Sequence, residues 1–186
     1  MRLVLIRHAA SAPAPDLAEP LWPLSEEGDA QAQALATLLS ARGVDPDCVV
    51  RLVSSPYLRA LQTLRPLANR LGLPLYQHRD LAERRLSSLR LDDWRAQLAR
   101  TWKDFDYVLP GGESSRACQN RVCSALQQIA QQHADHDTVA VCSHGNAIAL
   151  FLQHLQPTFG FDDWATMGNP EIYLCRHSPE GFELMA

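Results

Sequence analysis

The chain has 186 residues, of which 46% are hydrophobic and 20% are charged, and its formal net charge is −4. This length fits a single domain over residues 1–186 with a sizeable core, and the composition excludes a disordered chain. The acidic balance argues against nucleic acid as a partner, whereas a small phosphorylated ligand needs only a local positive pocket.

The first predicted element is a buried strand formed by the aliphatic residues 3–6. Such a run is typical of a parallel strand, and it is too short for a signal-peptide core or a membrane span. Arg7 and His8 follow at the carboxyl end of this strand, where open α/β sheets bind their ligands. A loop rich in proline and alanine is expected over residues 12–23.

The following segments alternate between helix and strand. Ser25 is a typical N-cap and Gly43 a typical helix end, so we expect one helix between them. A strand over 49–53 then leads to a second helix that begins at residues 55–56 and carries Arg59 near its start.

Residues 81–110 do not continue this alternation of strands and helices, and we interpret them as a small helical insert, or lid, near the site. Trp94 and Trp102 lie about two helical turns apart, so they are expected to pack the insert onto the sheet rather than to stack on a substrate. Near the start of the insert, Glu83 is a candidate acid whose pKa burial would raise, and Asp80 is its rival.

A long helix is predicted from the turn at 111–114 to about residue 133, followed by a strand over 138–142. A further helix begins at Gly145, and residues 172–185 form a terminal hairpin. Strands that alternate with helices predict an α/β fold, a three-layer α/β/α sandwich with a mostly parallel central sheet.

The strand over 138–142 runs directly into His144, as the first strand runs into His8. Two strands that each deliver a histidine to one sheet edge predict a single site with two imidazoles. Arg7 and Arg59 add guanidinium groups, each of which can donate two parallel N–H groups to a phosphoryl group. The sequence therefore predicts a phosphate pocket at this edge.

Transfer of the phosphoryl group also needs a nucleophile and a general acid. Cys142 is the best-placed thiol, but from its strand it would point into the sheet. A neutral imidazole can attack phosphorus directly, so His8 is the candidate nucleophile, with His144 opposite as a donor to the phosphoryl oxygens. Glu83 is the candidate proton donor to the leaving group.

Five motifs occur in order along nearly the whole chain: Leu5-Ile6-Arg7-His8, the segment Ser54 to Thr63, Leu81-Ala82-Glu83, Gly111-Gly112-Glu113-Ser114 and Ser143-His144-Gly145-Asn146. This ordered set resembles the histidine phosphatase superfamily, which includes cofactor-dependent phosphoglycerate mutases and many small phosphatases. The resemblance implies that His8 is phosphorylated, that Arg7, Arg59, His144 and Gly145 hold the phosphate, and that Glu83 donates the proton. It also implies no metal ion and no organic cofactor.

The chain departs from the family pattern after the candidate nucleophile. Ala9 and Ala10 stand where members usually have glycine and glutamate, while Ser11 falls where a serine or threonine often contacts phosphate. Residues 13–15 lack the asparagine of the mutases, and only Arg84 and its neighbour stand near Glu83, which is not the paired-arginine pattern of a mutase. These departures favour a phosphatase.

The predicted function is therefore a metal-independent phosphatase that hydrolyses phosphomonoesters through a phosphohistidine. The alternatives are a phosphoglycerate mutase-type phosphoryl transferase, a phosphohistidine-protein phosphatase, and a catalytically weak regulatory protein that only binds phosphate. The expected partner is a small phosphorylated substrate or a phosphoprotein, and neither nucleic acid nor a membrane. The five cysteines are scattered without a CxxC pair, which is typical of reduced thiols in a cytoplasmic protein.

Overall fold

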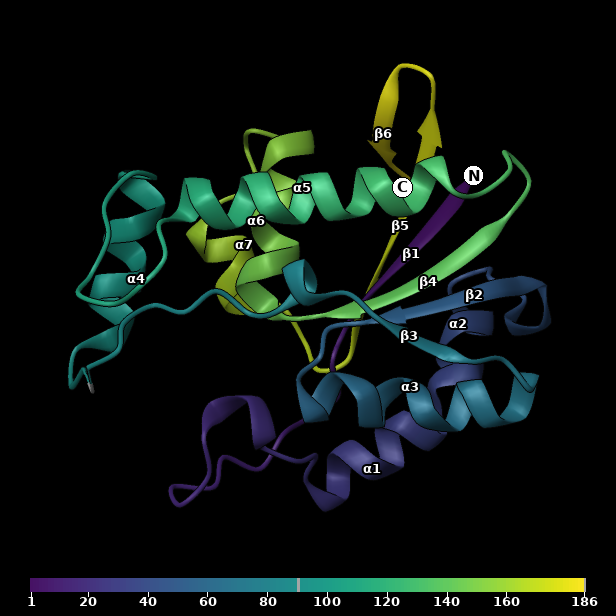
Figure 1. Cartoon of the computed structure of the whole chain (residues 1–186), viewed down its shortest axis with the longest axis horizontal. Coiled ribbons are helices and arrows are strands. Elements are labelled where there is room, and N and C mark those ends of the chain that lie inside the picture. Colours follow the sequence, from purple (N-terminus) through teal and green to yellow (C-terminus); the bar gives the residue numbers. More distant parts are fainter. Residues whose placement is uncertain (90, 186) are drawn as a thin grey trace.

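A six-stranded sheet forms the centre of the computed structural model, which describes residues 1–89 and 91–185 (Figure 1). Its strand order is β3-β2-β4-β1-β5-β6. The strands are β1 (Arg2–Arg7), β2 (Val49–Ser54), β3 (Leu75–Gln77), β4 (Thr138–Ser143), β5 (Glu171–Ser178) and β6 (Gly181–Leu184). The first four pair in parallel, whereas β5 and β6 form an antiparallel hairpin. The predicted mostly parallel sheet and its terminal hairpin are confirmed.

Helices cover both faces of this sheet, as predicted. The helices are α1 (Glu26–Gln33), α2 (Leu35–Ala41), α3 (Leu58–Leu71), α4 (Trp94–Lys103), α5 (Ser115–Gln131), α6 (Gly145–Leu155) and α7 (Phe161–Thr166). In Figure 1, α1, α2 and α3 lie below the sheet, and α5 and α6 lie above it. Short 3-10 turns occur at Glu19–Leu21, Pro46–Cys48 and Arg79–Leu81. The fold is an α/β/α sandwich.

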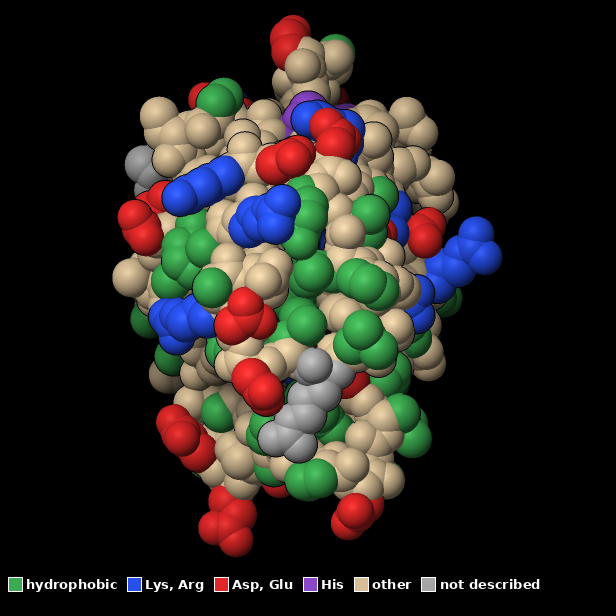
Figure 2. All heavy atoms as spheres, turned by 90° about the vertical axis from the view of Figure 1, so that its left-hand side faces the viewer, with side chains coloured by type: hydrophobic (Ala, Val, Ile, Leu, Met, Phe, Trp, Pro, Cys, Tyr) green, Lys and Arg blue, Asp and Glu red, His purple; other side chains and the backbone are tan. Residues whose placement is uncertain are grey.

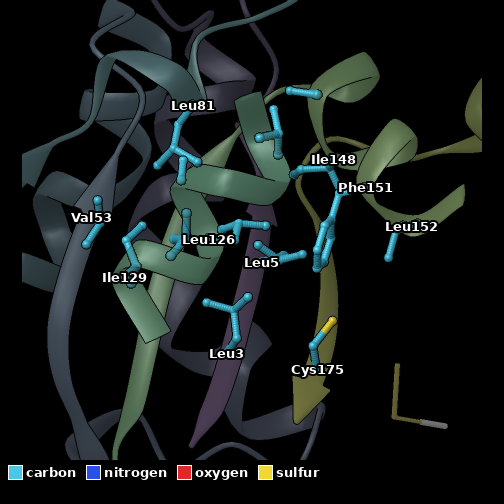
Figure 3. Packing of buried hydrophobic residues seen from close by; sticks show 14 of the residues in the cluster. Leu3, Leu5, Val53, Leu81, Leu126, Ile129, Ile148, Phe151, Leu152 and Cys175 are labelled. Carbon is cyan, nitrogen blue, oxygen red and sulfur yellow. The ribbon is translucent and has the colours of Figure 1, made fainter. Parts of the chain in front are cut away.

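The alternation of side chains along β1 divides the core between the two faces. Leu3 and Leu5 point to the face covered by α5 and α6, where Leu126 and Phe151 pack against the strands (Figure 3). Val4 and Ile6 point to the opposite face, which α2 and α3 cover. Burial on both faces explains why the strand reads as an unbroken apolar run.

The single helix expected between Ser25 and Gly43 is instead two helices, α1 and α2, that meet at Ala34. The two helices pack against different parts of the molecule. Ala32 of α1 lies in a small buried cluster with Ala9, whereas the leucines of α2 enter the main core on that face of the sheet. Because each helix follows its own packing surface, the segment bends between them.

Helix α3 begins at Leu58, two residues later than the sequence suggested. Ser55 is still tied to the end of β4, because its backbone N–H donates to the Cys142 carbonyl at 2.9 Å. The Ser55 hydroxyl in turn accepts from the Tyr57 N–H at 3.2 Å. The chain therefore turns away from the sheet before the helix can start.

The insert over 81–110 contains α4, and its residue 90 lies outside the described part of the chain. Trp102 packs against the core as predicted, with its ring centroid 6.0 Å from that of Phe105. The same prediction was wrong for Trp94, whose side chain is 47% exposed and lines a cavity instead. Among the described residues, no helix combines the length and apolar character needed to cross a membrane.

Candidate active site

The two histidines meet at the carboxyl edge of the sheet because β1 and β4 are parallel neighbours. Arg7 pairs in register with Ser143, so the next residue of each strand, His8 and His144, leaves the sheet at the same level. Their ring centroids lie 5.1 Å apart, with an interplanar angle of 62°. The structure thus brings together the two imidazoles that the sequence placed at one edge.

His8 is held in one tautomer by contacts on both ring nitrogens. Its Nδ1 lies 2.7 Å from the Ala9 carbonyl oxygen, a partner that can only accept a proton. Its Nε2 accepts from the Arg59 Nε–H at 3.1 Å. The hydrogen-bond partners therefore assign the proton to Nδ1 and leave the lone pair on Nε2.

The His8 ring also stays neutral. Burial, together with the nearby Arg59 and Arg7 guanidinium groups, lowers the pKa of His8 to about 3. At neutral pH the ring is uncharged, so the unprotonated Nε2 can act as a nucleophile once the Arg59 N–H transfers its hydrogen bond to the incoming group.

His144 is fully buried on the other side of the pocket. Its Nε2 lies 2.7 Å from the Ser55 hydroxyl, and its Nδ1 has no hydrogen-bond partner among the described residues. Burial and the neighbouring His8 lower the pKa of His144 well below its usual value. An incoming anion would reverse this effect, because it favours the protonated ring.

Arg7 reaches the pocket from the end of β1. Its Nη1–H donates to the Met167 carbonyl at 2.6 Å, while its buried Nε has no partner within the described chain. Gly145 permits this approach, because a Cβ there would lie 3.3 Å from Arg7 Nε and 3.1 Å from Trp164 Nε1. An unpartnered buried donor is costly unless a ligand satisfies it, which fits an oxyanion at this position.

Arg59 is only 4% exposed and is already engaged by the loop that precedes α1. One of its terminal nitrogens donates to the Glu19 carbonyl at 2.9 Å, and the other donates to the Glu19 carboxylate at 3.0 Å. Sequence reasoning missed Glu19, because nothing in its local sequence links it to a residue 40 positions away. A phosphoryl group that binds Arg59 must compete with this carboxylate.

We expect Glu19→Gln to strengthen inhibition by orthophosphate, lowering its inhibition constant about threefold to tenfold. The change removes a negative charge that repels phosphate and occupies Arg59, and a partly exposed pair of this kind is worth about 1 kcal/mol. Competitive inhibition kinetics measure the effect. Glu26→Gln, an exposed acid at the start of α1, is the matched control. Unchanged or weaker inhibition in Glu19→Gln would contradict the prediction.

Glu83 sits over the first turn of α6. Its carboxylate accepts from the Asn146 N–H at 3.2 Å, the Ala147 N–H at 3.1 Å and the Arg84 N–H at 2.8 Å. Removal from water raises the pKa of Glu83 above its usual value, although these amide donors oppose the shift. The carboxyl is thus biased towards the protonated form that a general acid needs.

Asp80, the other candidate acid, does not face this pocket. The Asp80 carboxylate faces the exposed Arg79, 3.7 Å away, and does not line the cavity beside the site. Arg84 does not form an ion pair with Glu83 either, because its guanidinium donates to the Ser115 hydroxyl at 2.7 Å and to the Glu113 carbonyl at 3.2 Å. Of the two candidate acids, the structure brings only Glu83 to the histidines' side of the pocket.

An arginine that sequence reasoning missed holds the backbone around Glu83. Arg121 on α5 donates to the Asp80 carbonyl at 2.7 Å and to the Ala82 carbonyl at 2.8 Å. The same guanidinium forms two hydrogen bonds with Glu113, at 2.7 and 2.8 Å. A signal existed, since Glu113 belongs to a motif and Arg121 follows it by eight residues, about two helical turns.

Arg121→Ala should therefore act through Glu83. We expect hydrolysis of alkyl phosphates to slow about tenfold, with a smaller effect on aryl phosphates, because aryl leaving groups need less protonation. Steady-state rates on both substrate types, with the melting temperature as a check on folding, measure this. Arg116→Ala on the same helix, whose partner is the exposed Asp106, is the control. Equal slowing of both substrates would show that Arg121 only stabilises the fold.

The two alanines after His8 leave the pocket open. Ala9 is fully buried and packs with Leu24 and Ala32, and its N–H donates to the Thr63 hydroxyl at 3.0 Å. The Ala10 backbone packs closely against Gly28 of α1, where a Cβ would lie only 1.9 Å from the Ala10 carbonyl oxygen. Since the Ala9 methyl group enters the protein interior, this departure from the family pattern does not obstruct the site.

The predicted position Ser11 lies outside the site, whereas Asn169, which sequence reasoning missed, supports it. Ser11 forms an isolated backbone bridge with Leu24, and within the described chain its hydroxyl makes no hydrogen bond to the site residues. In contrast, the segment after α7 supports the site directly, because the Asn169 side-chain amide donates to the His8 carbonyl at 2.7 Å. The site is therefore supported on one side by residues that follow α7 in sequence.

Comparison with known proteins agrees with this geometry. Residues 3–186 match the model of the histidine phosphatase superfamily, branch 1, whereas no curated protein matches significantly. The chain is similar to a mycobacterial glucosyl-3-phosphoglycerate phosphatase, with 25% identity and a TM-score of 0.77 over 99% of this chain and 95% of that one. A phosphoserine phosphatase variant from Entamoeba histolytica, at 17% identity, shares the fold with a TM-score of 0.73 over 100% and 95% of the two chains.

Proposed function

The chain belongs to the histidine phosphatase superfamily and is a phosphatase, and we propose that it hydrolyses phosphomonoesters through a phosphohistidine at His8, without a metal ion. The observation that carries the proposal is the state of the His8 ring. Its Nδ1 faces the Ala9 carbonyl at 2.7 Å, and its pKa of about 3 keeps Nε2 unprotonated. A neutral imidazole with a fixed tautomer is the form that attacks phosphorus.

In the first step, His8 Nε2 donates its lone pair to phosphorus, and the bond from phosphorus to the ester oxygen breaks. The Arg59 Nε–H, which donates to Nε2 at 3.1 Å, transfers its hydrogen bond to a phosphoryl oxygen. Arg7 and His144 supply further donors around the equatorial oxygens. These donors stabilise the charge that shifts onto the oxygens in the transition state.

Glu83 protonates the departing oxygen, so the leaving group departs as an alcohol rather than an alkoxide. The raised pKa of this carboxyl supports the role. In the second step the water oxygen attacks phosphorus while the Glu83 carboxylate takes a proton from that water. The bond between phosphorus and Nε2 breaks. Orthophosphate leaves, and both His8 and Glu83 return to their starting states.

Hydrolysis fits the site better than mutase chemistry does. Arg84, one of the two arginines beside Glu83, is directed to the Ser115 hydroxyl and the Glu113 carbonyl. The proposed substrate is a small phosphorylated molecule, as the similar phosphatases suggest by their names. The five cysteines are all free, which supports a cytoplasmic location.

Hydrolysis of p-nitrophenyl phosphate in excess chelator tests the proposal. We expect sustained turnover, and rapid quenching with 32P-labelled substrate should trap protein-bound phosphate that is labile to acid and stable to base, as a phosphoramidate is. Loss of activity on chelation, or turnover without any trapped phosphoenzyme under pre-steady-state conditions, would reject the mechanism.

A further inference from the structure

A cavity of about 490 Å³ opens beside the phosphate pocket. Glu83 and Glu19 line it, and each also contacts the pocket, Glu83 at the start of α6 and Glu19 at Arg59. Because the proposed proton donor stands at this boundary, the group attached to the ester oxygen must extend into the cavity. The cavity therefore decides which leaving groups the protein accepts.

The walls of this cavity are mainly apolar. Its aromatic and aliphatic lining residues include Trp22, Trp94, Trp164, Leu86, Leu91 and Leu98. They come from the loop before α1, from the insert and from α7, so three segments distant in sequence converge around one space. Figure 2 looks onto the side of the molecule that carries α4 and shows hydrophobic side chains across its middle, interspersed with charged groups.

Several large apolar side chains at the cavity are exposed to solvent. Trp94 is 47% exposed and Leu89 is 60% exposed, although both line the cavity. Large apolar side chains that remain exposed around a concave site are typical of a surface that a ligand covers. Glu83 lines the cavity and also contacts the phosphate pocket. The ligand that covers these apolar side chains is therefore the leaving group of the phosphomonoester.

The charged groups around the cavity disfavour an anionic leaving group. The Glu19 carboxylate stands at its inner end, beside the Glu83 carboxyl that acts as the acid. The Arg84 guanidinium, only 4% exposed, donates to Ser115 and to the Glu113 carbonyl, and its remaining nitrogen is buried without a partner among the described residues. Among the described lining residues, the other cation is Arg85, which is exposed at the rim.

We propose that this phosphatase is selective for phosphomonoesters of bulky, uncharged, largely apolar alcohols, which it binds in the cavity between Trp22, Trp94 and Trp164. The inference rests on the proposed function, because it assigns the cavity to the leaving group. The apolar walls gain free energy from burying such a group, and the Glu19 carboxylate at the inner end disfavours an anionic one.

Four primary phosphate esters test this assignment: 2-phenylethyl phosphate, ethyl phosphate, glucose 6-phosphate and phosphoserine. All four leaving groups are primary alcohols that depart from phosphorus, so differences in kcat/KM report mainly what the cavity binds. We expect kcat/KM for 2-phenylethyl phosphate to exceed each of the others by at least about tenfold, the size expected for burying several apolar carbons. Equal values, or a preference for phosphoserine or glucose 6-phosphate, would overturn the proposal.

The variant Trp94→Ala removes one wall of the cavity. It should reduce the ratio of kcat/KM between 2-phenylethyl and ethyl phosphate by about fivefold or more. Tyr76→Ala is the matched control, because Tyr76 is 46% exposed and stacks on Arg51 away from the cavity. An unchanged ratio in Trp94→Ala, or an equal fall in Tyr76→Ala, would count against the cavity as the binding site.

Calorimetric binding separates this proposal from the proposed function. In His8→Ala, which lacks the nucleophile, 2-phenylethyl phosphate should still bind at least about fivefold more tightly than ethyl phosphate. If the wild type hydrolyses none of the esters in chelator, the proposed function fails, and the binding comparison still decides the cavity. Equal binding of the two esters would overturn the selectivity even if both are hydrolysed.

Discussion

His8→Ala is expected to abolish turnover, with kcat falling at least about a thousandfold, the scale typical of losing a catalytic nucleophile. The structure supplies the reason, because Nε2 of this ring is the unprotonated nitrogen that faces Arg59 at 3.1 Å. The measurement is p-nitrophenyl phosphate hydrolysis in chelator, beside quench trapping of phosphoenzyme. Both signals should vanish together.

His136→Ala provides the matched control, since this histidine has a side chain that is 88% exposed. It should retain wild-type turnover and phosphoenzyme. If His8→Ala kept substantial activity, or lost activity while still forming an acid-labile phosphoenzyme, another residue would carry the phosphoryl group. His144 would then be the first residue to replace.

Glu83→Gln is expected to slow alkyl phosphates about a hundredfold or more, the range typical of removing a general acid, and aryl phosphates much less. Glutamine keeps the size of the side chain but has no acidic proton to donate. A plot of log kcat/KM against leaving-group pKa measures the effect, and the variant should give the steeper slope. Equal slopes in variant and wild type would reject Glu83 as the acid.

The pH dependence gives a second test of the same role. Burial raises the pKa of Glu83, and the protonated form is the active acid, so alkyl phosphate hydrolysis should fall as pH rises through that pKa. Glu83→Gln should remove this alkaline limb. His8 contributes no acid limb between about pH 5 and 8 in the free enzyme, because its pKa of about 3 leaves the ring neutral throughout.

The parts of the site that sequence reasoning predicted all depend on short-range patterns. Arg7 and His8 end one apolar strand and His144 follows another, so strand periodicity and parallel topology were enough to place them together. Arg59 was predicted because it lies near the start of a helix that follows a strand, and its Nε does reach His8. The resemblance added Glu83, which local pattern alone left in competition with an aspartate.

The features that were missed depend on contacts between loops and helices far apart in the chain. Glu19 lies 40 residues from Arg59, and Arg121 lies 39 residues from the Ala82 carbonyl that it holds. The orientation of Trp94 depends on how the insert settles against the sheet, which helical spacing does not encode. These contacts are set by tertiary packing, and the only signal in the sequence was the spacing of Arg121 from the motif that contains Glu113.

The first turn of α6 has a mechanical consequence for the whole site. His144 immediately precedes this helix, and the Glu83 carboxylate is anchored on the N–H groups of Asn146 and Ala147. One rigid element thus fixes the spacing between the phosphate-facing imidazole and the carboxyl. When α6 shifts, both groups move together, so their separation tolerates thermal motion. A homologue could change its entrance loops while α6 kept the distance between the phosphate-facing imidazole and the proton donor.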